Sequence, residues 1–206
     1  HNIHLVESLS FFDGIPLNKV REITGIWDDT FNHTLVGLRM SHIANGVSKL
    51  HGEVSRDMWK GHPGICPIIH ITNAQNKKYW ADAWLDEAFE NKDREALIKR
   101  KTRLKAKLFD VVADQTGKLF DPNILTIVWA RRFADYKRPD LITRDYDRFI
   151  KLLSNTKRPV QIIFAGKPYP MDYGAIHNFD NLTHISKNIK NMAVLTGYEL
   201  ALSKSM

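Results

Sequence analysis

The spacing of apolar residues predicts that the first part of the chain is mainly helical. Apolar positions recur at helical intervals in segments that Pro, Gly or Asn residues bound. The helices expected on this basis span residues 16–23, 34–43, 49–59, 77–89 and 94–119. One apolar run, residues 67–71, is too short for a helix and predicts a buried strand. Asn45 and Gly46 are expected to end the helix before them.

A different pattern begins after the turn formers at residues 121–123. Continuous apolar runs at 124–130 and 159–165 predict strands that are covered on both faces. Segments 140–153 and 174–188 predict helices, 192–195 a third strand, and 199–206 the start of another helix. This alternation is typical of right-handed βαβ units in a parallel sheet. The expected fold class is α/β, with one domain ending near residue 120 and a Rossmann-like domain beginning at 121.

Composition excludes several classes of protein. The 206 residues are 43% hydrophobic and 26% charged, as in ordinary globular domains. One cysteine, Cys66, rules out an internal disulfide framework and a zinc site built from cysteines, and it fits a reducing compartment. The histidines lack carboxylates at ligand spacing, so no metal is expected. No window approaches the roughly 18 apolar residues of a membrane helix, so we expect a cytoplasmic protein without a membrane partner.

The net charge of +7 favours an anionic partner. Part of this charge lies in a basic run at residues 92–107, which fits a nucleic-acid-binding segment at first sight. The run has neither interleaved aromatic residues nor a recognisable reading motif. It is therefore expected to be the solvated face of a helix, and no nucleic acid partner is expected.

Four cations follow the first predicted strand of the second half: Arg131, Arg132, Lys137 and Arg138. Open α/β sheets bind ligands beyond the carboxyl ends of their strands. The helix that follows would turn its positive amino end to the same place. Arg and Lys side chains hold phosphate oxygens well. The pattern predicts a site for phosphate or a phosphorylated ligand, and a solvated basic loop is the alternative.

Three weaker signals accompany this cluster. Lys167 places another cation after the second strand, but not at P-loop spacing. Ser48 and His51 are typical of a helix cap rather than of a nucleophile with its base, because no Gly-x-Ser-x-Gly elbow frames the serine. Asn73, after the strand at 67–71, suits either sugar hydroxyls or a simple turn.

Four strings, in this order, resemble the α-glucan (glycogen/maltodextrin) phosphorylase family, particularly its shorter bacterial and archaeal branch. They are NGVSKLHGEVSRDMW at 45–59, HITN at 70–73, ILTIVWARRFADYKRPDL at 124–141 and PVQIIFAGKPYP at 159–170. The resemblance implies a retaining glycosyltransferase of GT-B architecture, in which two Rossmann-like domains face across a cleft. Such enzymes split a terminal glucosyl unit from α-1,4-glucan with inorganic phosphate and release glucose 1-phosphate.

The resemblance also implies roles for individual residues. Arg132 and Lys137, with Arg131 beside them, match contacts to substrate phosphate and cofactor phosphate. Tyr136 and Lys167 match the neighbourhood of the active site.

In the first half of the chain, Asn73 and His51 match positions around the bound glucosyl unit. Ala74 stands where the family has a glycine, so backbone freedom is lost there.

The cofactor of the family is pyridoxal phosphate, whose phosphate relays a proton. The family's Schiff-base lysine lies in a Glu-Ala-Ser-Gly string that this chain lacks. We therefore expect pyridoxal phosphate in a parent enzyme but not on the isolated chain. The chain is expected to be an internal fragment, inactive by itself. Residues 1–120 would end the amino-terminal GT-B domain, and residues 121–206 would form the first βαβ units of the next.

The expected partners are inorganic phosphate, α-1,4-glucan and the remainder of the same polypeptide, with a second copy of the chain left open. Two alternatives remain at this point. One is a module that binds phosphate or glucan without chemistry. The other is a GT-B relative of glycogen or starch synthase, which uses a nucleotide sugar.

Overall fold

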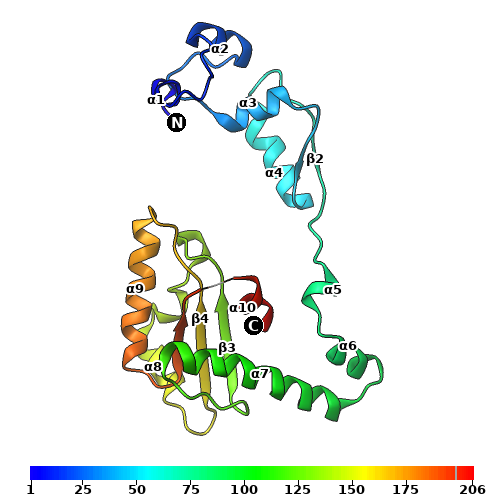
Figure 1. The fold of residues 1–206 in the computed structure, drawn as a ribbon, viewed down its shortest axis with the longest axis vertical. Coiled ribbons are helices and arrows are strands. Elements are labelled where there is room, and N and C mark those ends of the chain that lie inside the picture. The colour runs from blue at the N-terminus through cyan, green and yellow to red at the C-terminus, as the bar shows by residue number, and fades with distance from the viewer. Residues whose placement is uncertain (198) are drawn as a thin grey trace. The chain divides into compact units, whose positions relative to one another are not determined.

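The computed structural model describes residues 1–197 and 199–206, and the chain forms two compact units, His1–Asn76 and Lys77–Met206 (Figure 1). Each unit buries its own apolar clusters, so the two are described separately. The domain boundary expected between residues 120 and 121 stays a prediction. Among the described residues, no helix is both long and apolar enough to cross a bilayer.

The first unit consists of short helices and one pair of strands. Its elements are α1 (Ile3–Ser8), α2 (Leu17–Thr24), α3 (His33–Met40), β1 (Ala44–Gly46), α4 (Lys49–Trp59) and β2 (Ile68–His70). Helix α4 has its predicted bounds, and α2 lies within one residue of its prediction. Helix α1 was not predicted, because six residues are too few to show a helical period. It begins where the Asn2 side chain accepts hydrogen bonds from the His4 and Leu5 N–H groups.

Strands β1 and β2 are parallel, with Gly46 opposite His70. Residues 45 and 46 therefore form a strand, and the prediction that they end the preceding helix was wrong. Helix α3, expected at 34–43, ends at Met40, where Ser41 is already extended. The prediction of a buried strand at 67–71 was wrong, because Ile69 is 41% exposed and only Ile68 in β2 is buried. Helix α4 packs on both strands at a close approach, since a Cβ on Gly46 would lie 2.5 Å from the Gly52 nitrogen. A pair of strands with one helix leaves its other side exposed.

The second unit is a three-stranded parallel sheet with helices on both faces. Its helices are α5 (Lys77–Trp80), α6 (Ala83–Glu90), α7 (Arg94–Thr116), α8 (Tyr146–Leu153), α9 (Tyr173–Lys187) and α10 (Leu200–Ser205). Its strands are β3 (Leu125–Ala130), β4 (Val160–Ala165) and β5 (Met192–Leu195), in the order β3-β4-β5. The parallel sheet confirms the α/β fold class and is compatible with part of a Rossmann-like fold.

Three predicted helices of this unit are shorter or divided. The helix expected at 94–119 ends at Thr116, because Gly117 adopts the left-handed conformation that ends a helix. The helix expected at 77–89 splits into α5 and α6, because Asp82 starts a new helix by accepting a hydrogen bond from the Leu85 N–H. The helix expected at 140–153 starts only at Tyr146. Before it lies the 3₁₀ turn η2 (Leu141–Thr143), and Asp145 then caps α8.

Strand β4 is buried along its whole length, and its two faces contact different helices. Ile162 and Phe164 pack with α8 and α9, whereas Ile163 and Ala165 pack with α7 and α10. This alternation is the period of two that a strand requires. Strand β3 is covered only in part. Trp129 packs in the cluster on one face of the sheet, and Val128 and Ala130 pack in the cluster on the other, but Leu125 is 63% exposed. The prediction that β3 is covered on both faces was therefore wrong for the start of the strand.

A buried glutamine fixes the turn that leads into the sheet. Gln161, in the middle strand, accepts a hydrogen bond from the Asp121 N–H at 2.7 Å and donates one to the Asp121 carbonyl at 2.9 Å. Because a buried amide without partners is costly, this pair of bonds both satisfies Gln161 and positions the start of β3.

Helices α6 and α7 are joined by a two-pronged ion pair. The Arg100 guanidinium donates to both carboxylate oxygens of Asp82, at 3.0 and 2.6 Å. Hydrogen bonding from Arg100 holds the pKa of Asp82 below its usual value, and burial opposes the effect. The contribution of this pair to stability is therefore complete above the ordinary Asp pKa and is lost as the pH falls through the lowered one.

The Lys118 side chain, just after α7, bonds to the segment that runs from the end of α9 to the start of β5. Its Nζ donates to the backbone carbonyls of Ser186, Ile189 and Met192, the last two at 3.0 and 2.7 Å. Burial lowers the pKa of this amine, while three carbonyl oxygens favour its charged form.

We expect Lys118→Met to lower the free energy of unfolding of the second unit by about 2–4 kcal/mol, because three hydrogen bonds from one ammonium group are lost. The Ser186 and Ile189 carbonyls keep a backbone N–H as a second partner. Urea denaturation followed by circular dichroism measures the change. Lys107→Met, at an exposed position of α7, is the control and should stay within about 0.5 kcal/mol. Equal midpoints for the two variants would contradict the proposed role of Lys118.

Candidate functional site

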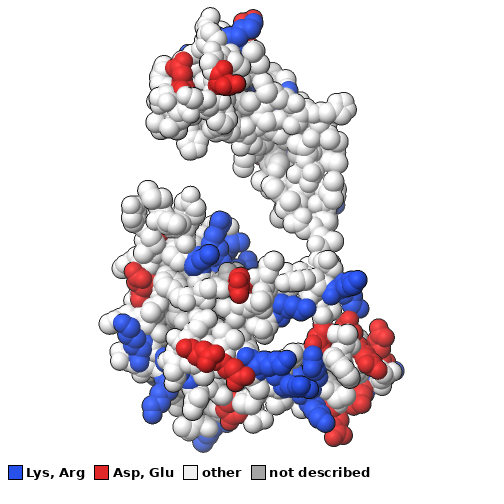
Figure 2. All heavy atoms as spheres, in the orientation of Figure 1, with Lys and Arg blue, Asp and Glu red and all other residues white. Residues whose placement is uncertain are grey.

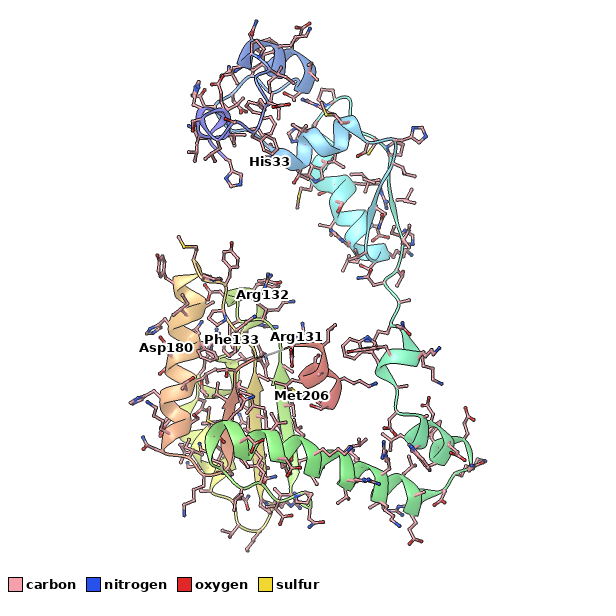
Figure 3. The ribbon with its side chains drawn as sticks, viewed as in Figure 1. His33, Arg131, Arg132, Phe133, Asp180 and Met206 are labelled. Carbon is pink, nitrogen blue, oxygen red and sulfur yellow. The ribbon has the colours of Figure 1, made fainter. Side chains whose placement is uncertain are left out.

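The loop at residues 131–138 continues β3 and is held by the end of β4. The Arg131 N–H donates to the Ala165 carbonyl at 3.0 Å, and the Phe133 N–H donates to the Lys167 carbonyl at 3.2 Å. The Phe133 ring is fully buried, with its centroid 4.8 Å from that of Trp129. Figure 3 shows Arg131, Arg132 and Phe133 at the end of the sheet where these strands finish. One buried ring thus anchors a loop whose arginines are exposed.

Gly166 is required by this close approach of two backbones. A Cβ at this position would lie 2.0 Å from the Arg131 carbonyl oxygen and 3.0 Å from the Phe133 ring. No side chain fits in that space. The glycine between the second strand and Lys167 therefore serves to let the 131–138 loop lie directly against β4.

Two of the four cations of the loop, Arg132 and Lys137, meet at Tyr136. The Lys137 Nζ lies 4.5 Å from the centroid of the Tyr136 ring, a distance typical of a cation–π contact. Interaction with Lys137, and then with the Arg132 guanidinium, lowers the pKa of the Tyr136 phenol, whereas burial opposes this. Tyr136 itself is exposed. The structure thus brings Arg132, Tyr136 and Lys137 together, as three of the predicted site residues.

A hollow of about 520 Å³ opens beside these residues. It is lined by Arg132, Phe133, Ala134, Asp135, Tyr136, Tyr169 and Asp172. Lys137 lines a neighbouring, mainly apolar hollow of about 440 Å³ together with Arg138. An anion in the first hollow would meet Arg132 and Tyr136, with Lys137 in the neighbouring hollow. It would also meet Asp135 and Asp172, so it would have to bind on the Arg132 side.

The amino end of α9 completes this hollow. Asp172 caps the helix by accepting a hydrogen bond from the Ala175 N–H, and the Asn178 amide donates to the Asp135 carboxylate at 3.3 Å. A Cβ on Gly174 would lie 3.3 Å from the same carboxylate. The helix whose first turns contact the loop is thus the one that follows β4. From the sequence we expected this of the helix that follows β3.

Two predicted residues lie nearby without lining this hollow. Arg131 and Lys167 are both exposed, and their backbones form the hydrogen bonds that join the loop to the end of β4. Their side chains add positive charge to the same end of the sheet.

The sequence did not single out Asp135, Tyr169 or Asp172 as residues of this hollow. Asp172 carried a usable signal, since an aspartate just before a predicted helix is a common cap. Asp135 and Tyr169 are recognised as lining residues only from the structure, in which α9 packs beside the loop.

In the first unit, Val47 links the two residues expected near a sugar. The Val47 N–H donates to His51 Nδ1 at 3.0 Å, and the Asn73 N–H donates to the Val47 carbonyl at 3.0 Å. The Ser48 hydroxyl accepts a hydrogen bond from the His51 N–H at 3.1 Å, which confirms the predicted cap. Because Nδ1 accepts a hydrogen bond, the neutral His51 ring carries its proton on Nε2.

His51 and Asn73 are both exposed, and one backbone unit holds their positions relative to each other. Within the described residues, no three His, Cys, Asp or Glu side chains gather as ligands of a metal ion would.

Known proteins show sequence similarity to most or all of the chain. An uncharacterised protein of Methanocaldococcus jannaschii is 42% identical over 205 residues, which cover 100% of this chain and 38% of that protein. A maltodextrin phosphorylase of Thermococcus litoralis is 30% identical over 95% of this chain and 28% of the enzyme. A glycogen phosphorylase of Aquifex aeolicus is 32% identical over 82% of this chain and 31% of the enzyme. No family model matches the chain.

The chain spans about a third of the length of these curated relatives. Identities near 30% to proteins named glycogen or maltodextrin phosphorylase support a phosphorylase-related origin of the sequence. The similarity extends over residues of both units, since it covers most of the chain.

Proposed function

We propose that the chain provides the phosphate-binding loop of an α-1,4-glucan phosphorylase of GT-B architecture. The observation that carries this proposal is the meeting of Arg132 and Lys137 at Tyr136, at the carboxyl end of β3. Similarity to proteins named phosphorylase supports it. In the longer protein, residues 1–120 and 121–206 would belong to two facing domains, and a terminal glucosyl unit would pass from glucan to inorganic phosphate.

The loop can contribute to this reaction by electrostatics and by position. Breaking a glycosidic bond with phosphate develops positive charge on the sugar beside a dianion. The Arg132 fork can hold two phosphate oxygens, and Lys137 adds a point charge beside them. Because Phe133 and Gly166 fix the loop before a ligand arrives, little reorganisation is needed when the charge develops. Arg131 and Lys167 raise the positive potential of the same end of the sheet.

Tyr136 offers a hydrogen-bond donor at the anion. Lys137 and Arg132 lower the pKa of this phenol, because they favour its ionised form. A bound phosphate would draw the same two cations to itself, and the phenol would then keep the proton that it donates. In the proposed site Tyr136 orients the phosphate while the two cations neutralise it.

The same cations fit the phosphate group of pyridoxal phosphate, the cofactor implied by the family resemblance. When bound, the cofactor would supply a phosphate that relays a proton. Arg132 and Lys137 are the residues of this chain that would hold it. No lysine of the printed sequence stands in a Glu-Ala-Ser-Gly string, so we assign the covalent attachment to none of them.

The glucosyl unit is assigned to Asn73 and His51. An amide side chain both donates and accepts hydrogen bonds, and the neutral His51 ring presents an N–H at Nε2. Both properties suit sugar hydroxyls. Ala74 follows Asn73 in an exposed segment, so the side chain that replaces a glycine of the family is not forced into the core.

The test is an assay of the longest natural reading frame that contains this chain. We expect maltoheptaose and phosphate to yield glucose 1-phosphate, and we expect the 206-residue chain alone to yield none. Transfer that requires a nucleotide sugar and ignores phosphate would favour the synthase alternative. Phosphate binding by calorimetry without any turnover would favour a binding module.

A further inference from the structure

The backbone turns sharply at Arg138, the last residue of the 131–138 loop. The 3₁₀ turn η1 (Asp135–Lys137) ends here, and Arg138 adopts a left-handed conformation with φ +50° and ψ +57°. Residues with a Cβ rarely adopt positive φ, and glycine or asparagine usually takes this place after a helical turn. The next residue is Pro139, and a proline pushes the residue before it toward extended backbone. Two preferences of the sequence therefore oppose the observed conformation of Arg138.

Two buried side chains hold this conformation, one on each side of the exposed turn. Phe133 and Pro139 are both fully buried, and they fix the two ends of the segment between them. The Arg138 N–H donates to the Asp135 carbonyl at 2.9 Å, and the Arg138 carbonyl accepts from the Leu141 N–H at 3.3 Å. An unfavourable backbone conformation persists only where the surrounding structure determines it. These anchors and bonds do so here.

The position of Lys137 depends on this turn. Lys137 is the last residue of η1, and its Nζ lies 4.5 Å from the centroid of the Tyr136 ring. An extended Arg138 would change the direction of the chain between Lys137 and Pro139, so one of the two would have to leave its place. Figure 2 shows Lys and Arg side chains gathered near the end of the sheet where the loop lies. The turn thus directs one cation of this group.

The guanidinium of Arg138 is not what holds the turn. Its side chain is exposed and lines the mainly apolar hollow with Lys137 and Pro139, not the hollow of Arg132. It has no ion pair with any residue that the structure describes. The effect of the backbone at this position can therefore be separated from the effect of the charge.

We propose that Arg138 is a positioning residue of the anion site. Its left-handed backbone keeps Lys137 at Tyr136, and the loop binds phosphate tightly only while this turn is in place. The inference rests on the proposed function, because it takes phosphate as the ligand of the loop. A side chain that resists positive φ moves the loop into conformations that do not bind. The apparent affinity then falls with the fraction of the loop that is competent.

Three variants test the backbone without changing the charge between them. Arg138→Gly, Arg138→Asn and Arg138→Val all remove the guanidinium, but glycine and asparagine accept positive φ, whereas valine resists it. Calorimetric titration of the 206-residue protein with inorganic phosphate at low salt measures the affinity. We expect the Gly and Asn variants to agree within about twofold and the Val variant to bind about tenfold more weakly, since left-handed backbone is costly for a residue with a Cβ.

Lys92 provides the matched control. It follows α6 in the same unit, is exposed and also has a left-handed backbone, with φ +56°. Lys92→Val should unfold at a lower urea concentration than Lys92→Gly, because the same conformation is again disfavoured. Both variants should bind phosphate with wild-type affinity. The pair shows whether reduced stability of the unit is enough to weaken binding.

Circular dichroism establishes that each variant is folded before the titrations are compared. Should Arg138→Val be unfolded, Arg138→Ala takes its place, with an expected loss of about threefold or more relative to Arg138→Gly. Equal affinities of the Gly and Val variants, or an equal loss in Lys92→Val, would overturn this inference and leave the proposed function intact. Absence of phosphate binding by the unsubstituted protein would overturn both.

Discussion

Lys137→Ala in the complete protein is expected to lower kcat/KM for phosphorolysis by about 100-fold or more. Removing a preorganised group that stabilises developing charge typically costs about two to three orders of magnitude. Lys137 lies over the Tyr136 ring, so its loss removes both the charge and the contact that orients the phenol. Initial rates of glucose 1-phosphate release at varied phosphate measure the effect.

The same assay separates binding from chemistry. Arg132→Ala should raise the KM for phosphate as well as lower kcat, because its side chain lines the hollow in which we place the anion. Arg148→Ala, at an exposed position of α8, is the control and should retain full activity. A loss of less than tenfold in Lys137→Ala, under about 1.4 kcal/mol of transition-state binding, would argue against the assigned role.

Gly166→Ala is expected to destabilise the second unit by more than about 3 kcal/mol. Overpacking usually costs about 1–3 kcal/mol, and here the new methyl group would meet a backbone carbonyl at 2.0 Å, which cannot turn away as a side chain can. Relief requires the 131–138 loop to leave the end of β4. We therefore expect weaker phosphate binding at temperatures where the variant is still folded.

Urea denaturation and phosphate titration check this expectation on one sample. Gly174→Ala is the matched control, because its nearest neighbour is a side-chain carboxylate at 3.3 Å and the position lies in a helix. Its free energy of unfolding should change little. Wild-type stability and affinity in Gly166→Ala would show that the loop does not depend on this close contact.

Much of the second unit follows from the sequence, because its strands are apolar runs of strand length. The runs at 159–165 and 192–195 became β4 and β5 nearly at their predicted bounds. The burial of the strands was predicted less accurately than their bounds. The run at 124–130 is as apolar as that at 159–165, yet its Leu125 is exposed. Edge position does not account for this difference, because β5 is also an edge strand and is buried along its whole length. Composition does not encode how far the helices cover each strand.

Local capping decided the helix boundaries that periodicity missed. Asp82 and Asp145 each accept a backbone N–H and start a new helix inside a segment whose apolar spacing looked continuous. In the first unit, Asn2 starts a helix too short for any period to appear. Aspartate and asparagine thus carried information that hydrophobic patterns did not.

The sequence predicted the cations of the candidate site but not the residues around them, and the anion site itself stays a prediction. Cations after a strand indicate an anion site, and Arg132 and Lys137 do meet at Tyr136. The contribution of Asp172 depends on how α9 packs against the loop, more than thirty residues further along the chain. Contacts between distant segments of this kind leave no local pattern.

The hydrogen bonds between Gln161 and Asp121 imply an order in which the candidate site forms during synthesis. Asp121 lies before β3, but the side chain that satisfies its backbone comes forty residues later. The 131–138 loop likewise depends on the carbonyls of Ala165 and Lys167. During synthesis the cations therefore emerge well before the strand that holds them, and they can take their places only after β4 has left the ribosome. A nascent chain that stops short of this strand carries the charges of the site without its geometry.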